Sequence, residues 1–273
     1  MPEGDSIYKE ARKLDAALKG RTIVHGELRV AALAGADLVG TTVLEHDTHG
    51  KHLLTRFDNG QTLHTHLRMD GSWTVVRPGK TLPRALDPDI RVLLATDSGP
   101  TAYGLGIPVV ELIPTAAEAQ VIGYLGPDPL RDDWDAEVAV ARLAAEPDRP
   151  INAALLDQRN LAGLGNLWVN ELCFLRGLGP WTPVAEVDLP ALVRLAARTL
   201  RHSALVPGAY QVTTGNNRRG QEQWVAGRAH QPCRRCRTPI RVTAEVTGDP
   251  ERRRTWWCPR CQPGPEPPES PQS

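Results

Sequence analysis

The sequence of 273 residues has no apolar run approaching the ~20 residues that a membrane-spanning helix needs, and its N-terminus lacks the hydrophobic core of a secretion signal. These absences argue against a membrane partner and against secretion, so we expect a cytoplasmic protein. Hydrophobic residues (41%) and charged residues (23%) occur in ordinary proportions, which excludes a chain that is disordered or fibrous as a whole. The length allows one large domain or two modest ones.

A net charge is also absent, because 32 basic residues balance 32 acidic residues, and this alone argues against an obvious nucleic-acid binder. The charges are unevenly distributed, however. Residues 218–261 contain eleven arginines and four acidic residues, a local charge of +7, whereas residues 1–217 carry −5. This asymmetry predicts that the C-terminal part binds a polyanion.

Cysteine is scarce, but four of the five cysteines form two pairs. Cys233-x2-Cys236 and Cys258-x2-Cys261 are separated by 21 residues, which is close to the spacing of a structural zinc site. Disulfides are uncommon in a cytosolic setting, and a redox role fits two such pairs in a basic, proline-flanked segment less well. We therefore predict one structural Zn²⁺ held by these four residues. Cys173 lies in an apolar helical stretch and is expected to be a small buried hydrophobic residue.

The first half of the chain alternates short apolar runs with turn residues. Ile7, Ala11, Leu14 and Leu18 follow helical spacing and precede Gly20, which predicts a first helix. Strands are predicted over residues 23–28, 41–45, 52–57, 62–67, 73–76, 91–96 and 109–113. Several short strands with frequent turns are typical of a sandwich or a barrel.

The pattern changes near residues 126–129, after which helical periodicity predominates. Helices are predicted over residues 135–146, 150–157, 167–175 and 189–203, the last with Asp188 as N-cap and Pro190 just inside. A strand-like stretch, 240–246, lies between the cysteine pairs. Residues 263–273 contain five prolines and no large apolar residue, which predicts disorder. The expected segments are a β domain (1–125), a helical domain (126–225), a zinc module (226–262) and a disordered tail (263–273).

The N-terminus offers a candidate nucleophile. Pro2 is small enough to permit removal of Met1, which would leave a terminal secondary amine whose pKa starts near ~8 and would be lowered at a helix N-terminus. A neutral secondary amine attacks carbonyl carbons to give an iminium, and the adjacent Glu3 can supply or take protons. This dipeptide alone says little, because many chains begin this way.

Six motifs, taken in order along the chain, are more specific. They are Met1-Pro2-Glu3-Gly4-Asp5, Gly50-Lys51-His52-Leu53-Leu54, His66-Leu67-Arg68-Met69-Asp70-Gly71, Leu125-Gly126-Pro127-Asp128-Pro129-Leu130, the run from Leu156 to Asn166, and Cys258-Pro259-Arg260-Cys261-Gln262. Together they resemble the formamidopyrimidine-DNA glycosylase/endonuclease VIII family of base-excision repair enzymes. The Met-Pro-Glu-Gly start resembles the endonuclease VIII branch.

The resemblance implies an α+β fold. An N-terminal helix and a two-layer antiparallel β-sandwich would be followed by a helix–two-turn–helix domain and a zinc β-hairpin, with DNA between the halves. It also implies catalytic roles. Pro2 would attack C1′ of the damaged nucleotide, Glu3 would protonate the ring oxygen of the sugar, and Lys51 would contact the phosphate beside the lesion rather than being a solvated surface lysine. Lysine is scarce here, with five against 27 arginines.

Further DNA contacts are implied in the second half of the chain. Asn166 follows two glycines at a helix start, where an amide and backbone N–H groups suit a phosphate, and a simple helix cap is compatible with this role. Glu171 matches a helical glutamate that points toward DNA, with a structural salt bridge as the alternative. Arg253 matches the arginine of the zinc hairpin that grips phosphates, although Arg252 or Arg254 could occupy that register.

Two residues of the first half are matched to the DNA as well. Met69 would fill the space of an extruded base, as apolar wedges do, and a core methionine is the alternative. His66 would contact the DNA backbone or merely pack.

The sequence departs from the family pattern at several points. Arg237 stands where a glycine commonly follows the second cysteine, and the usual glycine before Pro-Cys is replaced in His230-Gln231-Pro232-Cys233. The spacer between the cysteine pairs is also slightly longer than in the family. These departures affect the expected geometry of the hairpin tip, whereas the expected metal binding is unaffected. The segment Thr213–Trp224 is shorter than the lesion-capping loop of the formamidopyrimidine branch. That favours endonuclease VIII, whereas His66-Leu67-x-Met69 resembles the other branch.

We therefore predict a monomeric bifunctional DNA glycosylase/AP lyase that acts on damaged double-stranded DNA at the bacterial nucleoid. It would excise oxidised bases, in particular pyrimidines, and cleave the strand by β,δ-elimination. The alternatives are a non-enzymatic zinc-dependent DNA-binding protein on the same scaffold and an RNA-binding or ribosome-associated protein. The presence of Pro2, Glu3 and Lys51 together favours the enzyme.

Overall fold

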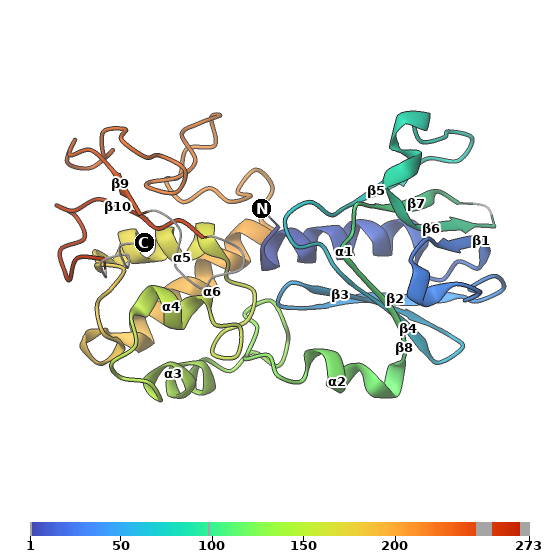
Figure 1. The fold of residues 1–273 in the computed structure, drawn as a ribbon, viewed down its shortest axis with the longest axis horizontal. Helices are drawn as coiled ribbons and strands as arrows, with labels where there is room; N and C mark the ends of the chain where they lie inside the picture. Colours follow the sequence, from blue (N-terminus) through green and yellow to red (C-terminus); the bar gives the residue numbers. More distant parts are fainter. Residues whose placement is uncertain (1, 98, 244–252, 268–273) are drawn as a thin grey trace. The chain divides into compact units, whose positions relative to one another are not determined.

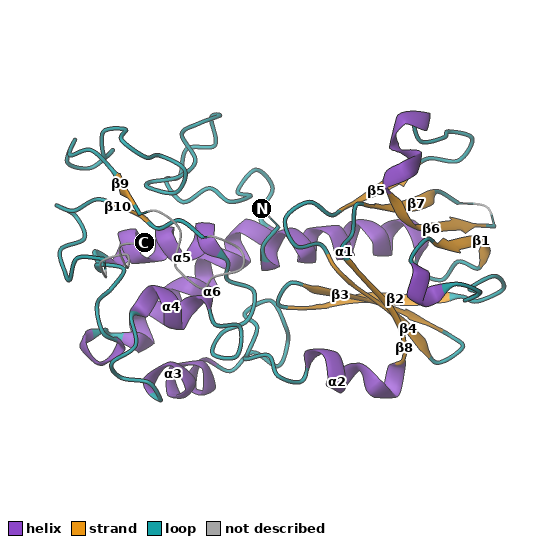
Figure 2. Cartoon of the chain, viewed as in Figure 1, coloured by secondary structure: helices purple, strands orange, loops and turns teal. Residues whose placement is uncertain are grey.

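The computed structural model describes residues 2–97, 99–243 and 253–267, and the chain divides into two compact units, Met1–Tyr124 (unit 1) and Leu125–Ser273 (unit 2). Figure 1 labels the helices and strands of both units, and Figure 2 colours them by type. Among the described residues, no helix is both long enough and apolar enough to cross a membrane.

Unit 1 contains one long helix, α1 (Gly4–Leu18), and two four-stranded antiparallel sheets with the orders β2-β3-β4-β8 and β1-β6-β7-β5. The strands are β1 (Ile23–Leu28), β2 (Val43–His49), β3 (His52–Phe57), β4 (Gln61–His66), β5 (Ser72–Val76), β6 (Ile90–Thr96), β7 (Thr101–Leu105) and β8 (Val109–Pro114). Short 3₁₀ helices span Ala31–Leu33, Arg84–Asp89 and Thr115–Ala117, and α2 (Glu118–Ile122) closes the unit. The predicted α+β fold with an antiparallel sandwich is confirmed.

The apolar face of α1 fills the core of unit 1. Its buried residues are those that the helical spacing predicts, from Ile7 to Leu18. They pack with buried side chains of both sheets, such as Phe57 and Leu94. Since α1 contacts β2 and β3 of one sheet and β5 and β7 of the other, this packing holds the helix, and Glu3 at its N-cap, in place within unit 1.

Besides the short 3₁₀ helices, the sequence analysis missed one strand and one α-helix of unit 1. Strand β7 lies between Pro100 and Gly106 and contains Gly104, so its composition is that of a turn. Gly104 is needed inside the strand, because a Cβ atom there would lie 2.7 Å from Cδ1 of Ile107. Helix α2 has only five residues, too few for a helical period to be visible.

The described residues of unit 2 form four α-helices, α3 (Ala136–Ala144), α4 (Ile151–Leu156), α5 (Asn166–Arg176) and α6 (Leu189–Leu205). They also form a 3₁₀ helix at Val184–Glu186 and the two-residue strands β9 (Arg241–Val242) and β10 (Trp256–Trp257). The predicted N-cap of α6 is present, since Asp188 Oδ1 accepts a hydrogen bond from the backbone N–H of Ala191 at 3.1 Å. Trp168, Leu172 and Leu192 lie in the core between the helices.

The cysteine segment belongs to unit 2 rather than standing apart. Its buried residues Cys233, Ile240 and Cys258 form a cluster with Phe174 of α5 and Val225. The predicted strand over 240–246 is shorter, because β9 covers only two residues, and 244–246 lie outside the described residues. Of the predicted disordered tail, residues 263–267 are placed, with Glu266 paired to Arg241, and 268–273 lie outside the described residues.

Candidate functional site

The candidate nucleophile stands at the start of α1. Glu3 is the N-cap of this helix and is fully buried, and its backbone N–H donates to the hydroxyl of Ser6 at 3.2 Å in a capping box. Pro2, immediately before it, is half-buried and lies at the positive end of the helix dipole. The structure thus places a secondary amine precursor and a buried carboxyl next to each other at a rigid helix terminus.

Lys51 occupies the two-residue turn between β2 and β3. His49 pairs with His52 across this turn, and Gly50 has a φ of +59°, a left-handed conformation that suits glycine. Lys51 is half-buried. The turn is therefore tight, and it holds the base of the Lys51 side chain at the end of a sheet rather than on a flexible loop.

A chain of hydrogen bonds begins beside Lys51 and runs through two buried histidines. Tyr124 Oη lies 3.2 Å from His52 Nε2, His52 Nδ1 lies 2.8 Å from His64 Nε2, and His64 Nδ1 lies 2.9 Å from a carboxylate oxygen of Glu111. A carboxylate oxygen accepts, so His64 donates to Glu111 from Nδ1 and His52 donates to His64 from Nδ1. The hydroxyl of Tyr124 then donates to Nε2 of His52. Burial is the main cause that lowers the pKa of His52 to about 3, with smaller electrostatic contributions from the neighbouring basic residues, which include Lys51. His52 is therefore neutral at physiological pH.

This chain was missed by sequence reasoning, which gave a role to one histidine of the group. One signal in the sequence could have revealed it. His64 and His66 are two residues apart in a predicted strand, so their side chains lie on the same face of β4. Cross-strand pairing then brings His52 opposite His66.

The hydrogen bonds of His66 define its tautomer. Its Nδ1 accepts the backbone N–H of Arg68 at 3.1 Å, so the ring hydrogen is assigned to Nε2. Arg68 adopts a φ of +47°, a left-handed conformation that is costly for a non-glycine residue. The ring also packs edge-on against His52 with 4.8 Å between centroids. His66 therefore packs against His52 while its Nδ1 binds the backbone of the β4–β5 turn.

Met69 follows in the turn between β4 and β5. The residue is 48% exposed, whereas the neighbouring Leu67 and Trp73 are buried. The core interpretation of Met69 is therefore wrong. An exposed thioether at a turn is compatible with insertion into a base stack.

Asn166, the first residue of α5, is 4% exposed. Its amide Nδ2 donates to the backbone carbonyl of Arg254 at 2.8 Å, and Asn170 Nδ2 lies 3.2 Å from its Oδ1. Asn170 in turn accepts the N–H of Trp256 at 2.8 Å. One N–H of the Asn166 amide thus holds the backbone of the cysteine segment, and the phosphate contact of Asn166 stays a prediction.

Glu171 is fully buried inside unit 2. Its carboxylate accepts the backbone N–H groups of Trp224, Val225 and Ala226 at 2.8–2.9 Å and the hydroxyl of Thr213. Burial raises its pKa above the usual carboxyl value, opposed by these hydrogen bonds. No ion pair of Glu171 is present in the described part of the chain, and a fully buried side chain has no surface to offer DNA. Both earlier interpretations of Glu171 are therefore replaced by a role in anchoring a loop.

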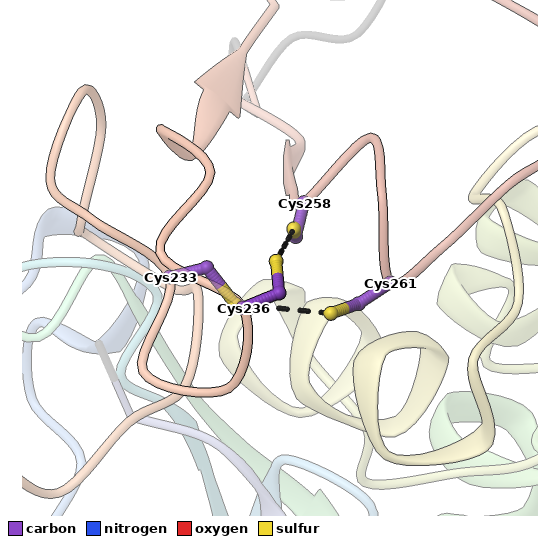
Figure 3. Close-up of side chains that lie close together, drawn as sticks. All are labelled: Cys233, Cys236, Cys258 and Cys261. Carbon is purple, nitrogen blue, oxygen red and sulfur yellow. Dashed lines mark hydrogen bonds between the residues drawn. The ribbon is translucent and has the colours of Figure 1, made fainter.

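The four paired cysteines converge (Figure 3). Their sulfur atoms all lie within 4.8 Å of one another, with Cys233–Cys261 at 3.9 Å and Cys236–Cys258 at 3.4 Å. A tetrahedral site with Zn–S bonds of about 2.3 Å requires sulfur–sulfur distances of roughly 3.8 Å. None of the four forms a disulfide. The donor set and its spacing therefore fit a bound metal ion.

The two departures from the family pattern fall at special backbone positions. Arg237, directly after the second cysteine, has a φ of +69°, and His230, three residues before the first cysteine, has a φ of +64°. Both are left-handed conformations in which glycine is favoured. The backbone therefore keeps the left-handed conformation at both positions, and Arg237 and His230 adopt it at a cost in conformational free energy.

Arg253 and Arg254 lead into β10. Arg253 is half-buried and Arg254 is exposed, while Arg252 lies outside the described residues. Because Asn166 binds the carbonyl of Arg254, the backbone that carries these two arginines is fixed to α5.

Comparison with known proteins matches two family models. Residues 1–103 match the formamidopyrimidine-DNA glycosylase N-terminal domain, and residues 125–206 match the formamidopyrimidine-DNA glycosylase H2TH domain. The chain belongs to the formamidopyrimidine-DNA glycosylase/endonuclease VIII family. The resemblance drawn from the six motifs is therefore confirmed.

Members of this family are similar to the chain over nearly its full length. A probable endonuclease 8 2 of Streptomyces coelicolor is 47% identical over 98% of this chain and 96% of its own. A DNA-(apurinic or apyrimidinic site) lyase, Nei2, of Mycolicibacterium smegmatis is 40% identical over 96% and 99%. The crystal structure of Lactococcus lactis Fpg with DNA containing N7-benzyl-Fapy-dG superposes with a TM-score of 0.77 at 22% identity, covering 96% of this chain and 100% of that one. This likeness supports the fold.

Proposed function

We propose that this chain is a bifunctional DNA glycosylase/AP lyase that excises oxidised bases, in particular pyrimidines, from double-stranded DNA. The observation that carries the proposal is the placement of Pro2 at the N-terminus of α1 beside the buried Glu3. The similar proteins named endonuclease 8 and AP lyase support the same reaction class. A monomeric, cytoplasmic protein is part of the proposal.

The first step uses the amine that removal of Met1 would expose. The lone pair of the Pro2 nitrogen attacks C1′, the bond from C1′ to the base breaks, and the base leaves with a proton. Glu3 donates a proton to the ring oxygen, so that the sugar opens and the new C1′–N bond becomes an iminium.

Strand cleavage follows from the iminium. Its positive nitrogen draws electrons from C1′, which makes the C2′ hydrogen acidic. Loss of that proton expels the 3′ phosphate, and a second elimination expels the 5′ phosphate. Water then releases the sugar fragment and regenerates the amine. The iminium accepts the electrons of both eliminations, so these steps need no redox cofactor.

Other side chains serve binding. Lys51 and the Nε2–H of His66, both at the same end of the β2-β3-β4 sheet, are suited to phosphate oxygens. Met69 would fill the space left by the extruded base. Arg253 or Arg254 would bind flanking phosphates. Cys233, Cys236, Cys258 and Cys261 would hold one Zn²⁺, the metal that four thiolates favour, in a structural role.

Covalent trapping tests the proposal. Mass spectrometry first establishes that the purified chain begins at Pro2, and borohydride is then added during reaction with duplex DNA containing an abasic site. We expect a covalent protein–DNA complex, which Pro2→Gly or a retained Met1 should largely abolish. Full trapping with Met1 attached would refute the assignment, because the Pro2 nitrogen would then be an amide. A panel of duplexes with oxidised pyrimidines or formamidopyrimidines resolves the lesion preference.

The absence of any trapping or base excision with the mature chain would favour the alternative of a non-enzymatic DNA-binding protein. Intact DNA affinity would accompany that result.

A further inference from the structure

A loop between α6 and the cysteine segment presents two exposed cations. This loop, Thr213–Trp224, is called the basic loop, and its tip, residues 215–221, is exposed. Gly215 and Gly220, with φ values of +79° and +75°, turn the chain at either end of the tip. Arg218 and Arg219 lie between them and form no ion pair within the described residues. Two such cations on one tight turn are suited to the phosphates of a polyanion.

The base of the basic loop is closed by its own hydrogen bonds. The backbone N–H groups of Thr213 and Thr214 both donate to the carbonyl of Glu222, at 2.9 and 3.1 Å. The indole N–H of Trp224 donates to the carbonyl of Thr213 at 3.1 Å. Glu171 of α5 accepts hydrogen bonds from both ends of the loop, from the Thr213 hydroxyl and from Trp224 N–H. The two ends are therefore fixed to α5 through one buried carboxylate.

The tip is held by an arginine of the first cysteine pair. Arg234 Nε donates to the carbonyl of Gln223 at 3.0 Å, and one terminal nitrogen donates to the carbonyl of Gly220 at 2.6 Å. The other terminal nitrogen donates to the side-chain oxygen of Gln221. A planar guanidinium that meets three acceptors on one loop defines the position of that loop more strongly than a single contact would.

The next residue reinforces this attachment. The Arg235 guanidinium lies 4.5 Å from the ring centroid of Phe174 and 5.5 Å from that of Trp224, and the two rings are stacked at 5.2 Å. Trp224 is the last residue of the basic loop. Both arginines within Cys233-Arg234-Arg235-Cys236 therefore contact the loop or its end.

We propose that Arg234 is a positioning residue, which couples the metal-binding turn to the basic loop and holds Arg218 and Arg219 in place for DNA phosphates. The turn between Cys233 and Cys236 acquires a fixed shape when both thiolates bind a metal ion, and the position of Arg234 follows from that shape. The metal site would thus support DNA binding at a surface it does not itself form. The inference rests on the proposed function in taking DNA as the ligand.

Limited proteolysis of the full-length, metal-loaded protein without DNA tests the coupling. Trypsin cleavage after Arg218 and Arg219 should be several-fold faster in Arg234→Ala than in the wild type, with Arg234→Lys between them. Arg260→Ala is the matched control, because it removes an exposed arginine from within the second cysteine pair and should leave this cleavage unchanged. Elemental analysis should find equal metal content in all four proteins. Wild-type cleavage in metal-loaded Arg234→Ala would overturn the proposal.

Salt-dependent binding to a duplex with a tetrahydrofuran abasic analogue tests the consequence for DNA. Arg234→Ala should weaken binding and flatten the salt dependence by about two phosphate contacts, although it removes one charge. In an Arg218→Ala/Arg219→Ala background, Arg234→Ala should cause no further loss. If the two losses were instead additive, Arg234 would act on DNA by itself and the proposal would be wrong.

These measurements are independent of catalysis. If the wild type failed to form a borohydride-trapped complex while the proteolysis and binding differences remained, the proposed enzymatic function would fail and the coupling would stand. If the wild type formed the trapped complex normally while loop cleavage in Arg234→Ala was unchanged, the enzymatic function would stand and the coupling would fail.

Discussion

Truncation of Met69 to alanine should separate base removal from strand cleavage. Full burial of a methionine side chain contributes about 1.5–3 kcal/mol. Since Met69 is 48% exposed, insertion into a base stack would bury the remaining half and contribute roughly 0.8–1.5 kcal/mol. A factor of ten in rate corresponds to about 1.4 kcal/mol. We therefore expect excision of a lesion from duplex DNA to fall roughly four- to twelve-fold in Met69→Ala.

Cleavage of a pre-formed abasic site should change little, because no base has to be displaced there. Single-turnover rates on the two substrates provide the comparison. Met69→Leu, which retains the apolar volume, is the control and should keep most of the excision activity. The melting temperature should hardly change, because truncating an exposed side chain lacks the roughly 2–5 kcal/mol cost of a buried one. A parallel loss of both activities together with a clearly lower melting temperature would refute the wedge role.

Three further perturbations have expected outcomes. Cys258→Ser should lose the metal, as measured by elemental analysis, and should bind DNA more weakly. The amide hydrogens of α1 and of the sandwich strands should remain protected from exchange, because unit 1 stays folded. Arg237→Gly should tighten metal binding several-fold in a chelator competition, because relief of left-handed strain of roughly 1–2 kcal/mol exceeds the added unfolded-chain entropy of roughly 0.4–1 kcal/mol; weaker binding would contradict this reasoning. The pKa of His52 is lowered from 6.5 to about 3 in the folded protein, so His52 of the unfolded chain binds its proton at a higher pH. The free energy of unfolding should therefore be greatest above pH 6.5. It should fall between pH 6.5 and pH 3 by up to about 1.4 kcal/mol per pH unit. Denaturant melts at pH 7 and pH 5 should show a shallower loss for His52→Gln than for the wild type.

The sequence predicted well those features that depend on local spacing. Strands β1 and β3 have the predicted bounds, because apolar residues and turn residues alternate clearly around them. The four cysteines converge as their spacing implies, since two Cys-x2-Cys turns can present four sulfur atoms to one point. In contrast, β7 was missed because Gly104 reads as a turn residue in the sequence, whereas in the structure it is a glycine because a side chain would not fit beside Ile107.

The roles of Asn166 and Glu171 illustrate what spacing and motifs leave undetermined. A motif match places a residue on an element, but the direction of its side chain depends on segments far along the chain. Asn166 binds a carbonyl 88 residues away, and Glu171 binds groups 42–55 residues away. The polarity of both side chains suggested a DNA contact, whereas both bind backbone groups of distant segments. Those that Glu171 binds at Val225 and Ala226 are buried and would otherwise cost free energy.

These internal bonds have a common consequence. Asn166 fixes the backbone of Arg254, Glu171 fixes the two ends of the basic loop, and Arg234 fixes its tip. Each bond joins α5 or the first cysteine pair to a segment that carries exposed arginines. A change at the metal site would therefore reach both the basic loop and the arginines before β10, so loss of the metal should reduce DNA affinity by more than the charges of the cysteine segment alone. In the proposed DNA binding, the four-cysteine site and the exposed arginines of unit 2 would therefore act as one cooperative assembly centred on α5.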